Sequence, residues 1–599
     1  MCGIVGYFSR GPATPSQQAL DQAVDLLAHR GPDDQGSWLN ANVGLGARRL
    51  SIQDLSDKGH QPMVSSDGRY VIAFNGEVYN FKQLRSGLES KGHSFASGTD
   101  TEVLLRLFQT EGRSCLEKLN GMFAIAIYER ESRKLFLARD RLGIKPLYLL
   151  DVSQGLFFAS EFKAFLPFVE ELSLPWQFDE NSLYEYMLFR YVAGPRTVLE
   201  HVRQCPPGSW MEVDADGCVK TGQYYSLEDL CAEANDRQLT DKFDEESCVD
   251  GVRERLRESI QLRLVSDAPL GIALSGGVDS SLITALLREI HSSPIKTFSV
   301  VFDEKESHGR TIDESPYSDW VSQKYQTEHT RLILDQKRFA DIYPQAVWHT
   351  DDPLNIPNSL GVFLFSEAAA PSVKVLLSGE GADEAFGGYE HFADPRPLHP
   401  MKHRLSRAED IRKLVRFPNE ALSYRDELLE ASHFQGANAE IYYSLRSYLL
   451  TVVNRLDKMS MANGIEMRVP FLDHGVVEAA IALPSIMKVR GQTTKYVLKS
   501  LAERYVPHQH AYRPKVGFST PLNMWLQDER HLGRYISILE EPRSLDRPFI
   551  RKKGVLELLA AHRHGPDTFR FSIAGRIWML LNLELWIRTF LEDKRPLAL

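Results

Sequence analysis

The part of the chain that most restricts its fold reads PLGIALSGGVDSSLITALLREI at residues 269–290. A short apolar run leads into a glycine turn, and an amphipathic helical pattern follows directly. The stretch VKVLLSGEGADEAFGGY at 373–389 again ends an apolar run in glycines. Strand, loop and helix alternate in this way from about residue 245, which predicts an α/β domain with a doubly wound parallel sheet.

The first 200 residues follow a different pattern. The run YVIAFNGEVYN at 70–80 reads as a strand that leads into an Asn-Gly turn, and 121–141 reads as a hairpin. Helical periodicity is confined to short segments, at 19–30 and 100–112. This mixture predicts an α+β domain. We therefore divide the chain into a first domain at 1–205, a linker at 206–245 and a second domain at 246–599, mainly helical after about residue 400.

Composition and charge exclude several classes of protein. Of the 599 residues, 43% are hydrophobic and 25% are charged, the balance of an ordinary globular protein. The net charge of −10 argues against a nucleic-acid partner, and no apolar run reaches the ~18 residues needed to span a membrane. The six cysteines form no CxxC pair, so neither a disulfide framework nor a zinc site is expected. Because the start lacks the pattern of a signal peptide, we expect a cytoplasmic location.

The glycine turn of the second half has the chemistry of a phosphate site. Glycines let backbone N–H groups approach a polyphosphate, and the following helix N-terminus adds partial positive charge. The hydroxyls of Ser275, Ser280 and Ser281 can donate to phosphate oxygens, and Asp279 can hold Mg²⁺. No Walker motif is present, so a P-loop is excluded. Taken alone, this turn is equally compatible with a plain strand–helix connection.

A second loop at 377–384 strengthens the nucleotide hypothesis. It brings a serine, glycines and three carboxylates to another strand end, and ligands bind at the carboxyl edge of parallel sheets. Further along, Lys495 could close over a pyrophosphate leaving group, although a solvated helix residue is the alternative.

SGGVDSS, SGEGADE and EMRVPFLD together resemble the synthetase domain of the glutamine-dependent asparagine synthetases, whose pyrophosphate-loop motif belongs to the ATP pyrophosphatases. The resemblance implies that ATP and Mg²⁺ bind here, that Glu380 and Lys495 are catalytic, and that Asp279 and Asp383 hold the metal. It also implies an ATP site formed by Leu274, Ser275, Gly276, Gly277, Asp279, Ser280, Val300, Ser378 and Gly379.

The start of the chain, MCGIVGYFSR, raises a separate question. Cys2 could be a buried strand thiol, part of a targeting signal, or a reactive group. Removal of the initiator Met would give Cys2 a free α-amine, which can take the proton of the thiol. Attack on a side-chain amide then needs an oxyanion hole and a clamp for the charged end of the substrate. Arg49 can pair with a carboxylate, although it could instead lie on the surface.

Two further segments can complete such a site. NGEVYN presents Asn75, Gly76 and Glu77 at a strand end, suited to an oxyanion donor and an ammonium acceptor. SGTDTE presents Asp100, which could instead cap the helix that follows it.

This set resembles the class II glutamine amidotransferase domain of the N-terminal-nucleophile type, an αββα sandwich. The resemblance implies that Cys2 is the nucleophile and that Asn75 and Gly76 form the oxyanion hole. It implies a glutamine site formed by Arg49, Leu50, Ser51, Ile52, Asn75, Gly76, Glu77 and Asp100. Across both domains it implies a ligase that hydrolyses glutamine, channels ammonia and amidates an acyl-adenylate, and that can form a homodimer.

The acceptor acid is left open by the sequence. Aspartate is the first hypothesis, with release of AMP and pyrophosphate. In typical asparagine synthetases the segment before the SGEG loop carries a second acidic residue where this chain has Ile356, in HTDDPLNIPNSLGVF (349–363). A sugar uronate or a natural-product acid is therefore an alternative acceptor. A non-catalytic relative is a third alternative, although such proteins usually lose the nucleophile or the pyrophosphate loop, and both are present here.

Overall fold

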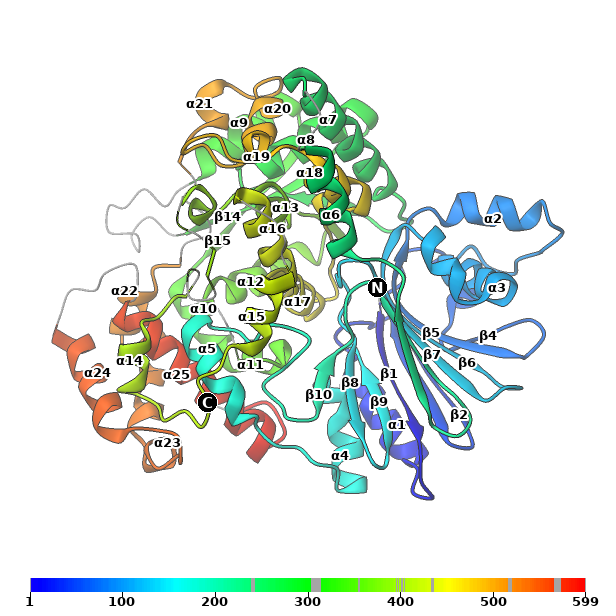
Figure 1. Cartoon of the computed structure of the whole chain (residues 1–599), viewed down its shortest axis with the longest axis horizontal. Coiled ribbons are helices and arrows are strands. Elements are labelled where there is room, and N and C mark those ends of the chain that lie inside the picture. The colour runs from blue at the N-terminus through cyan, green and yellow to red at the C-terminus, as the bar shows by residue number, and fades with distance from the viewer. Residues whose placement is uncertain are drawn as a thin grey trace.

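The computed structural model describes residues 2–238, 243–302, 314–353, 356–394, 396, 398–399, 402, 404–431, 436–514, 520–564 and 572–597. Its two halves are built differently, as Figure 1 shows, with a strand-rich half at the N-terminal end and a larger, helix-rich half after it.

The strands form three sheets. The strand bounds are β1 (Cys2–Ser9), β2 (Asp34–Asn40), β3 (Val43–Arg49), β4 (Met63–Val64), β5 (Tyr70–Val78), β6 (Gly121–Glu129), β7 (Lys134–Arg139), β8 (Tyr148–Val152), β9 (Gly155–Ala159), β10 (Val202–Gln204), β11 (Ser209–Val213), β12 (Val219–Gln223), β13 (Leu270–Ala273), β14 (Lys296–Phe302), β15 (Glu328–Leu334), β16 (Val375–Leu377) and β17 (Glu466–Arg468).

The α-helices pack on the outside of the two antiparallel sheets, surround the parallel sheet and form the C-terminal part (Figure 1). Their bounds are α1 (Gln17–Asp25), α2 (Phe81–Glu89), α3 (Asp100–Glu111), α4 (Leu166–Leu172), α5 (Leu183–Phe189), α6 (Leu227–Gln238), α7 (Glu245–Leu262), α8 (Val278–Ile290), α9 (Ser315–Tyr325), α10 (Gln336–Asp341), α11 (Tyr343–Thr350), α12 (Asn358–Ala369), α13 (Ala382–Phe386), α14 (Ala408–Arg412), α15 (Ser423–Ala431), α16 (Gly436–Ser447), α17 (Leu449–Met461), α18 (His474–Ala482), α19 (Ser485–Lys488), α20 (Tyr496–Ala502), α21 (His508–Ala511), α22 (Leu522–Gln527), α23 (Pro542–Leu545), α24 (Lys552–His564) and α25 (Ile573–Ile587).

The N-terminal half is the expected αββα sandwich. One antiparallel sheet has the order β10-β8-β9-β1-β3-β2 and the other β12-β11-β7-β6-β5-β4. Apolar side chains from both sheets meet between them, including Ile4 and Phe8 of β1 and Val71 and Ala73 of β5. Helices α1 and α4 pack on the outside of the first sheet, and α2 and α3 on the outside of the second.

Strand alternation decides which side chains reach the inside of this sandwich. Successive residues of a strand point to opposite faces. Cys2 therefore shares the inner face of β1 with Ile4 and Phe8, while Asn75 and Glu77 share the inner face of β5 with Ala73.

The second half contains the predicted parallel sheet, in the order β15-β14-β13-β16-β17. The chain extends the sheet in one direction from β13 through β14 to β15 and in the other from β16 to β17. The loops after β13 and β16 therefore lie at the point where the strand order reverses, which is the usual ligand position in such sheets. Both are the glycine loops singled out from the sequence.

The two halves share one hydrophobic core rather than a thin contact. Helices α4 and α5 of the first half pack in the same apolar cluster as α11, α22 and α25 of the second. Strands β11 and β12, which lie within the predicted linker, extend the second sheet of the first half. The division into domains stays a prediction. Among the described residues, no helix has both the length and the apolar character to cross a membrane.

Candidate active sites

Cys2 lies at the start of β1, where the sandwich faces the second half (Figure 1). Its side chain is buried, with 5% exposed. The Cys2 N–H donates to Asn75 Oδ1 at 3.1 Å, and Gln61 Nε2 lies 3.7 Å from the sulfur. Burial raises the pKa of the Cys2 thiol, and the positive charge of Arg49 acts against this rise. The targeting hypothesis gains no support from this position, since the thiol is buried inside the fold.

The backbone beside the thiol fits the predicted oxyanion hole. Asn75 is fully buried, and its Nδ2 donates to Ser160 Oγ at 3.3 Å. A Cβ at position 76 would lie 2.1 Å from the carbonyl oxygen of Met122, so only glycine lets β5 lie this close to β6. The Asn-Gly pair is therefore held by the sheet itself and is not the exposed turn suggested by the sequence.

Two buried carboxylates, Glu77 and Asp100, belong to the group of polar side chains around Cys2, which we name the Cys2 pocket. Glu77 accepts a hydrogen bond from Gln53 Nε2, and burial together with the charges of Glu466 and Asp100 raises its pKa to about 8. Burial also raises the pKa of Asp100 to about 6. Buried carboxyl groups with raised pKa values favour a cationic partner, because a nearby positive charge stabilises their ionised forms.

The alternative that Asp100 caps a helix is wrong. The cap of α3 is Thr99, whose hydroxyl accepts from the N–H of Glu102. Asp100 instead accepts the N–H of Val78 at 2.8 Å, which turns its carboxylate toward β5.

Arg49 is buried, with 6% exposed, so the surface alternative for it is also wrong. Its guanidinium donates to the carbonyl oxygens of Ser56, Gln53 and Asp54, at 2.9, 3.1 and 2.5 Å. These contacts fix the loop that carries the other predicted glutamine ligands, Leu50, Ser51 and Ile52.

The first glycine loop of the second half opens toward solvent at the N-terminus of α8. The Ser275 and Ser280 hydroxyls lie 3.2 Å apart, and the N–H of Gly277 donates to Ser275 Oγ at 3.2 Å. Gly276 has φ +74°, and a Cβ there would lie 2.5 Å from the backbone nitrogen of Ser318. Within the described part of the chain no side chain caps α8, so its first N–H groups are available to an anion.

The second loop lies directly against the first. A Cβ on Gly379 would lie 2.8 Å from the Cβ of Asp279. The N–H of Glu380 donates to Ser378 Oγ at 3.3 Å. The predicted adenosine neighbours Leu274 and Val300 differ in burial: Leu274 is fully buried, whereas Val300 on β14 is partly exposed.

Lys495 joins the two loops. Its Nζ lies 2.6 Å from Asp279 Oδ2 and 2.9 Å from Asp383 Oδ1, and only 6% of the residue is exposed, which excludes a solvated helix residue. Its backbone has φ +50°, an uncommon conformation for a non-glycine residue that recurs at functional sites. A Cβ at Gly388 would lie 1.9 Å from Asp383 Oδ1 and 2.2 Å from Lys495 Cε, so a glycine is needed behind the pair.

The carboxylates of Asp279 and Asp383 are suited to bind Mg²⁺. Among the described residues, the buried Oδ1 of Asp279 has no hydrogen-bond partner. Mg²⁺ is usually bound by one or two carboxylates together with substrate phosphates. Asp279 and Asp383 therefore fit the ion, and they do so without a protein-only ligand cluster, which the described residues do not contain.

Several residues of the two sites had no assigned role in the sequence analysis. Arg455 of α17 reaches Glu380, with Nη2 3.2 Å from Oε1. His510 Nε2 and Arg513 Nη2 contact the carbonyl oxygen of Gly276, at 2.7 and 3.2 Å. Arg468 of β17 lies 3.5 Å from Glu77. The sequence pattern that could have indicated some of them is a charged residue inside an apolar segment, as in RLDK and EMRVPF. A charged side chain that is buried in such a segment requires a partner of opposite charge.

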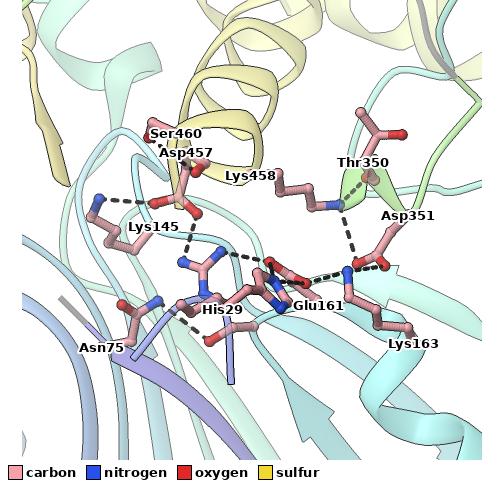
Figure 2. A network of polar contacts seen from close by, with 12 residues as sticks. His29, Asn75, Lys145, Glu161, Lys163, Thr350, Asp351, Asp457, Lys458 and Ser460 are labelled. Atoms are coloured by element: carbon pink, nitrogen blue, oxygen red, sulfur yellow. Dashed lines mark hydrogen bonds and ion pairs between the residues drawn. The ribbon is translucent and has the colours of Figure 1, made fainter. Parts of the chain in front are cut away.

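A network of buried ion pairs fills the boundary between the sites (Figure 2). Arg30 donates to the carbonyl oxygen of Cys2 and pairs with Glu161 and Asp457, at 2.8 and 2.7 Å. Asp457 also pairs with Lys145 at 3.0 Å. On the other side, Lys163 pairs with Glu161 and Asp351, and Lys458 lies 3.5 Å from Asp351. Broken pairs would leave buried charges unmatched, so the network fixes how the halves meet.

Comparison with known proteins gives matches over both halves. The family model described as asparagine synthase matches residues 251–588, and the glutamine amidotransferase domain model matches residues 1–225. The asparagine synthetase [glutamine-hydrolyzing] 1 of Bacillus subtilis (strain 168) is 32% identical, over 99% of this chain and 98% of that protein. A putative asparagine synthetase [glutamine-hydrolyzing] of Mycobacterium bovis is 30% identical, over 99% and 98%. The amidase chyE of Penicillium rubens is 28% identical, over 88% of this chain and 89% of its own.

Proposed function

This chain belongs to the glutamine-hydrolysing asparagine synthetase family, and we propose that it makes ammonia from glutamine at Cys2 and uses it to amidate an ATP-activated carboxylate, with aspartate as the acceptor. Two observations together carry the proposal. The Cys2 pocket holds two buried carboxylates suited to an ammonium group, and Lys495 links the two glycine loops of the parallel sheet.

The glutaminase step begins with the Cys2 thiolate. Its α-amine, freed by loss of Met1, takes the thiol proton, and the sulfur attacks the side-chain amide carbon of glutamine. Asn75 Nδ2 and the N–H of Gly76 donate to the developing oxyanion. Glu77 and Asp100 hold the α-ammonium, and Arg49 pairs with the α-carboxylate. The proton passes to the leaving ammonia, and water then releases glutamate from the thioester.

In the synthetase step, the acceptor carboxylate attacks the α-phosphorus of ATP and pyrophosphate leaves. The N-terminus of α8 and Lys495 hold the departing pyrophosphate. Ammonia then attacks the acyl-adenylate, Glu380 takes its proton, and AMP leaves as the amide forms. Mg²⁺ bound to Asp279 and Asp383 would neutralise part of the phosphate charge.

A cavity lined by Arg455, the partner of Glu380, supports an acceptor of about the size of an amino acid. It measures about 60 Å³ as seen by the centre of a water molecule. One water needs about 10–15 Å³ of such space, so the cavity holds roughly four to six waters. Its lining includes Asp352, Arg455 and Lys458, which offers both signs of charge to a zwitterion. Among the described residues, the buried Asn454 Oδ1 and Arg455 Nε in this lining have no hydrogen-bond partner.

A different carboxylic acid is the second candidate for the acceptor. Ile356 favours it, because this position is commonly acidic in the synthetases that the chain resembles. The neighbouring residues 354 and 355 lie outside the described residues. The cytoplasmic location and the homodimer expected from the sequence stay predictions.

The deciding experiment measures pyrophosphate release and amide formation with ATP across a panel of carboxylic acids. Aspartate should give both products, with glutamine or with ammonia as the nitrogen source. The Cys2→Ala variant should lose the reaction with glutamine and keep the reaction with ammonia. If a uronate gives both products and aspartate gives neither, the acceptor is wrong and the chemistry stands; if no acid releases pyrophosphate, the proposal fails. Intact-mass analysis that finds Met1 retained would remove the proposed base.

A further inference from the structure

Arg468 contacts both candidate sites. Its side chain lies near Glu77 in the Cys2 pocket, and its main chain accepts a hydrogen bond from the glycine loop at Ser378. It lies on β17, at the edge of the parallel sheet, and is fully buried. Glu466 and Arg468 share one face of this strand, since they are two residues apart. The second half of the chain therefore places two charged side chains close to Glu77 of the first half.

Three hydrogen bonds from two of its nitrogens fix the guanidinium of Arg468. Its Nε donates to Glu466 Oε1 at 2.5 Å, and its Nη1 donates to the carbonyl oxygens of Arg263 and Val265, at 2.7 and 2.8 Å. The plane of the fork is thereby fixed, which suits arginine and not lysine.

The third nitrogen, Nη2, faces Glu77 and lacks a hydrogen bond of normal length within the described part of the chain. Arg468 Nη2 lies 3.5 Å from Glu77 Oε2, and among the described residues it has no hydrogen-bond partner. A hydrogen bond to a carboxylate is usually about 2.7–2.9 Å long. A shift of well under 1 Å would therefore complete the bond, and leaving it incomplete in a buried place costs free energy.

The main chain of Arg468 leads to the nucleotide loops. The N–H of Ser378 donates to its carbonyl oxygen at 2.9 Å, at the point where β16 ends and the second glycine loop begins. Ser378 Oγ in turn accepts from the N–H of Glu380. Any movement of β17 that brings Nη2 closer to Glu77 also moves the support of this loop.

We propose that Arg468 is a positioning residue that couples the two sites, so that a nucleotide on the Ser378 loop and glutamine at Glu77 each strengthen the binding of the other. This inference rests on the proposed function. Such coupling is reciprocal, because the same factor must appear in both affinities, and factors of about 5 to 150 are typical.

Binding to the Cys2→Ala protein tests the coupling without turnover. Glutamine affinity is measured by calorimetry with and without saturating α,β-methylene ATP and Mg²⁺, and nucleotide affinity with and without glutamine. We expect each ligand to tighten the other at least about fivefold. When Arg468→Lys is added to Cys2→Ala, each ligand should change the affinity of the other by less than about twofold. In the protein with Cys2 intact, Arg468→Lys should leave ammonia-dependent synthesis in place.

Arg263→Lys is the matched control. Arg263 is also buried and pairs with Asp473 at 2.8 Å. Both arginines pack on the ring of Tyr79, Arg263 at 4.5 Å and Arg468 at 5.5 Å from its centroid, so replacing Arg263 disturbs the same region. The Arg263→Lys variant should show the same coupling factor between glutamine and nucleotide binding as the Cys2→Ala protein. If Arg468→Lys does not fold, the double variant Arg468→Gln with Glu466→Gln removes both charges of the Arg468–Glu466 pair together, so neither of these two is left without the other.

Three outcomes overturn the inference: independent binding in the parent, an unchanged factor in both Arg468 variants, or loss of the factor in Arg263→Lys. These outcomes differ from failure of the proposed function, in which glutamine or the nucleotide would not bind even alone.

Discussion

Glutamine binding should strengthen steeply between pH 6 and pH 7.5, because Glu77 must lose a proton before it can hold the ammonium group. Burial, followed by the charges of Glu466 and Asp100, raises the pKa of Glu77 to about 8, and Arg468 acts against this rise. The pKa is raised in the free protein and a bound cation favours the ionised form, so binding releases a proton and affinity increases with pH.

The size of the effect follows from that pKa. A carboxyl group with a pKa of about 8 is ionised in roughly 1% of molecules at pH 6 and in roughly a quarter at pH 7.5, so affinity should rise about 25-fold. Asp100, whose pKa is about 6, adds about a factor of 2 over the same range.

The perturbation that tests this reasoning is Glu466→Gln. It removes the charge that raises the pKa of Glu77 most after burial, and it frees Arg468 from its partner at 2.5 Å. The pKa of Glu77 should fall. If it falls by one unit, the pH range in which the affinity increases should shift down by one pH unit, and binding at pH 6 should become about tenfold tighter.

Calorimetry of glutamine binding to the Cys2→Ala protein measures both quantities, and buffers of different ionisation enthalpy report the released proton. Glu89→Gln is the control, because Glu89 pairs with Arg85 at the exposed surface of α2. The reasoning is refuted if affinity is constant between pH 6 and pH 7.5, or if Glu466→Gln leaves the pH dependence where it was or moves it upward.

Three further predictions concern the synthetase half and the boundary. Lys495→Met should lower the rate of pyrophosphate release about 10²- to 10³-fold, while glutamine hydrolysis, assayed as glutamate formation, continues; equal losses in both would contradict its assignment. Gly388→Ala should likewise stop pyrophosphate release because the methyl group meets the Asp383–Lys495 pair, whereas Gly87→Ala, with open space around it, should leave activity intact in the same assay. Glu161→Gln should destabilise the protein by about 3–5 kcal/mol in denaturant unfolding, because Arg30 loses a buried partner; a change below about 1 kcal/mol would show that the pair is not needed.

Much of the architecture was predictable because it depends on local patterns. An α+β first half and a parallel-sheet second half follow from strand alternation and from strand–loop–helix order, the αββα arrangement of the first half was implied by the resemblance, and all three are confirmed. The place of β12 in the second sheet was not predictable, because β12 carries mostly exposed residues and joins the sheet by pairing with β11.

Motif residues could be found in the same way, but their surroundings could not. The sequence singled out Lys495, yet its contact with two loops depends on residues more than 100 positions away. Asp100 looked like a helix cap by propensity, and only the packing of α3 on β5 turns it toward Val78. Arg455 and Arg468 were overlooked as individuals, since a buried arginine is recognised only when its partners are known.

The sequence by itself predicted the chemistry that we propose for this chain, because the proposed nucleophile, the glycine loops and the carboxylates occur in short segments whose meaning is local. The tertiary structure decided how the two chemistries meet. Strand parity turns Cys2, Asn75 and Glu77 into one pocket, and the edge strand β17 brings Arg468 to that pocket while supporting the loop at Ser378. Such relations arise from packing between distant segments, which is why no pattern along the chain predicts them.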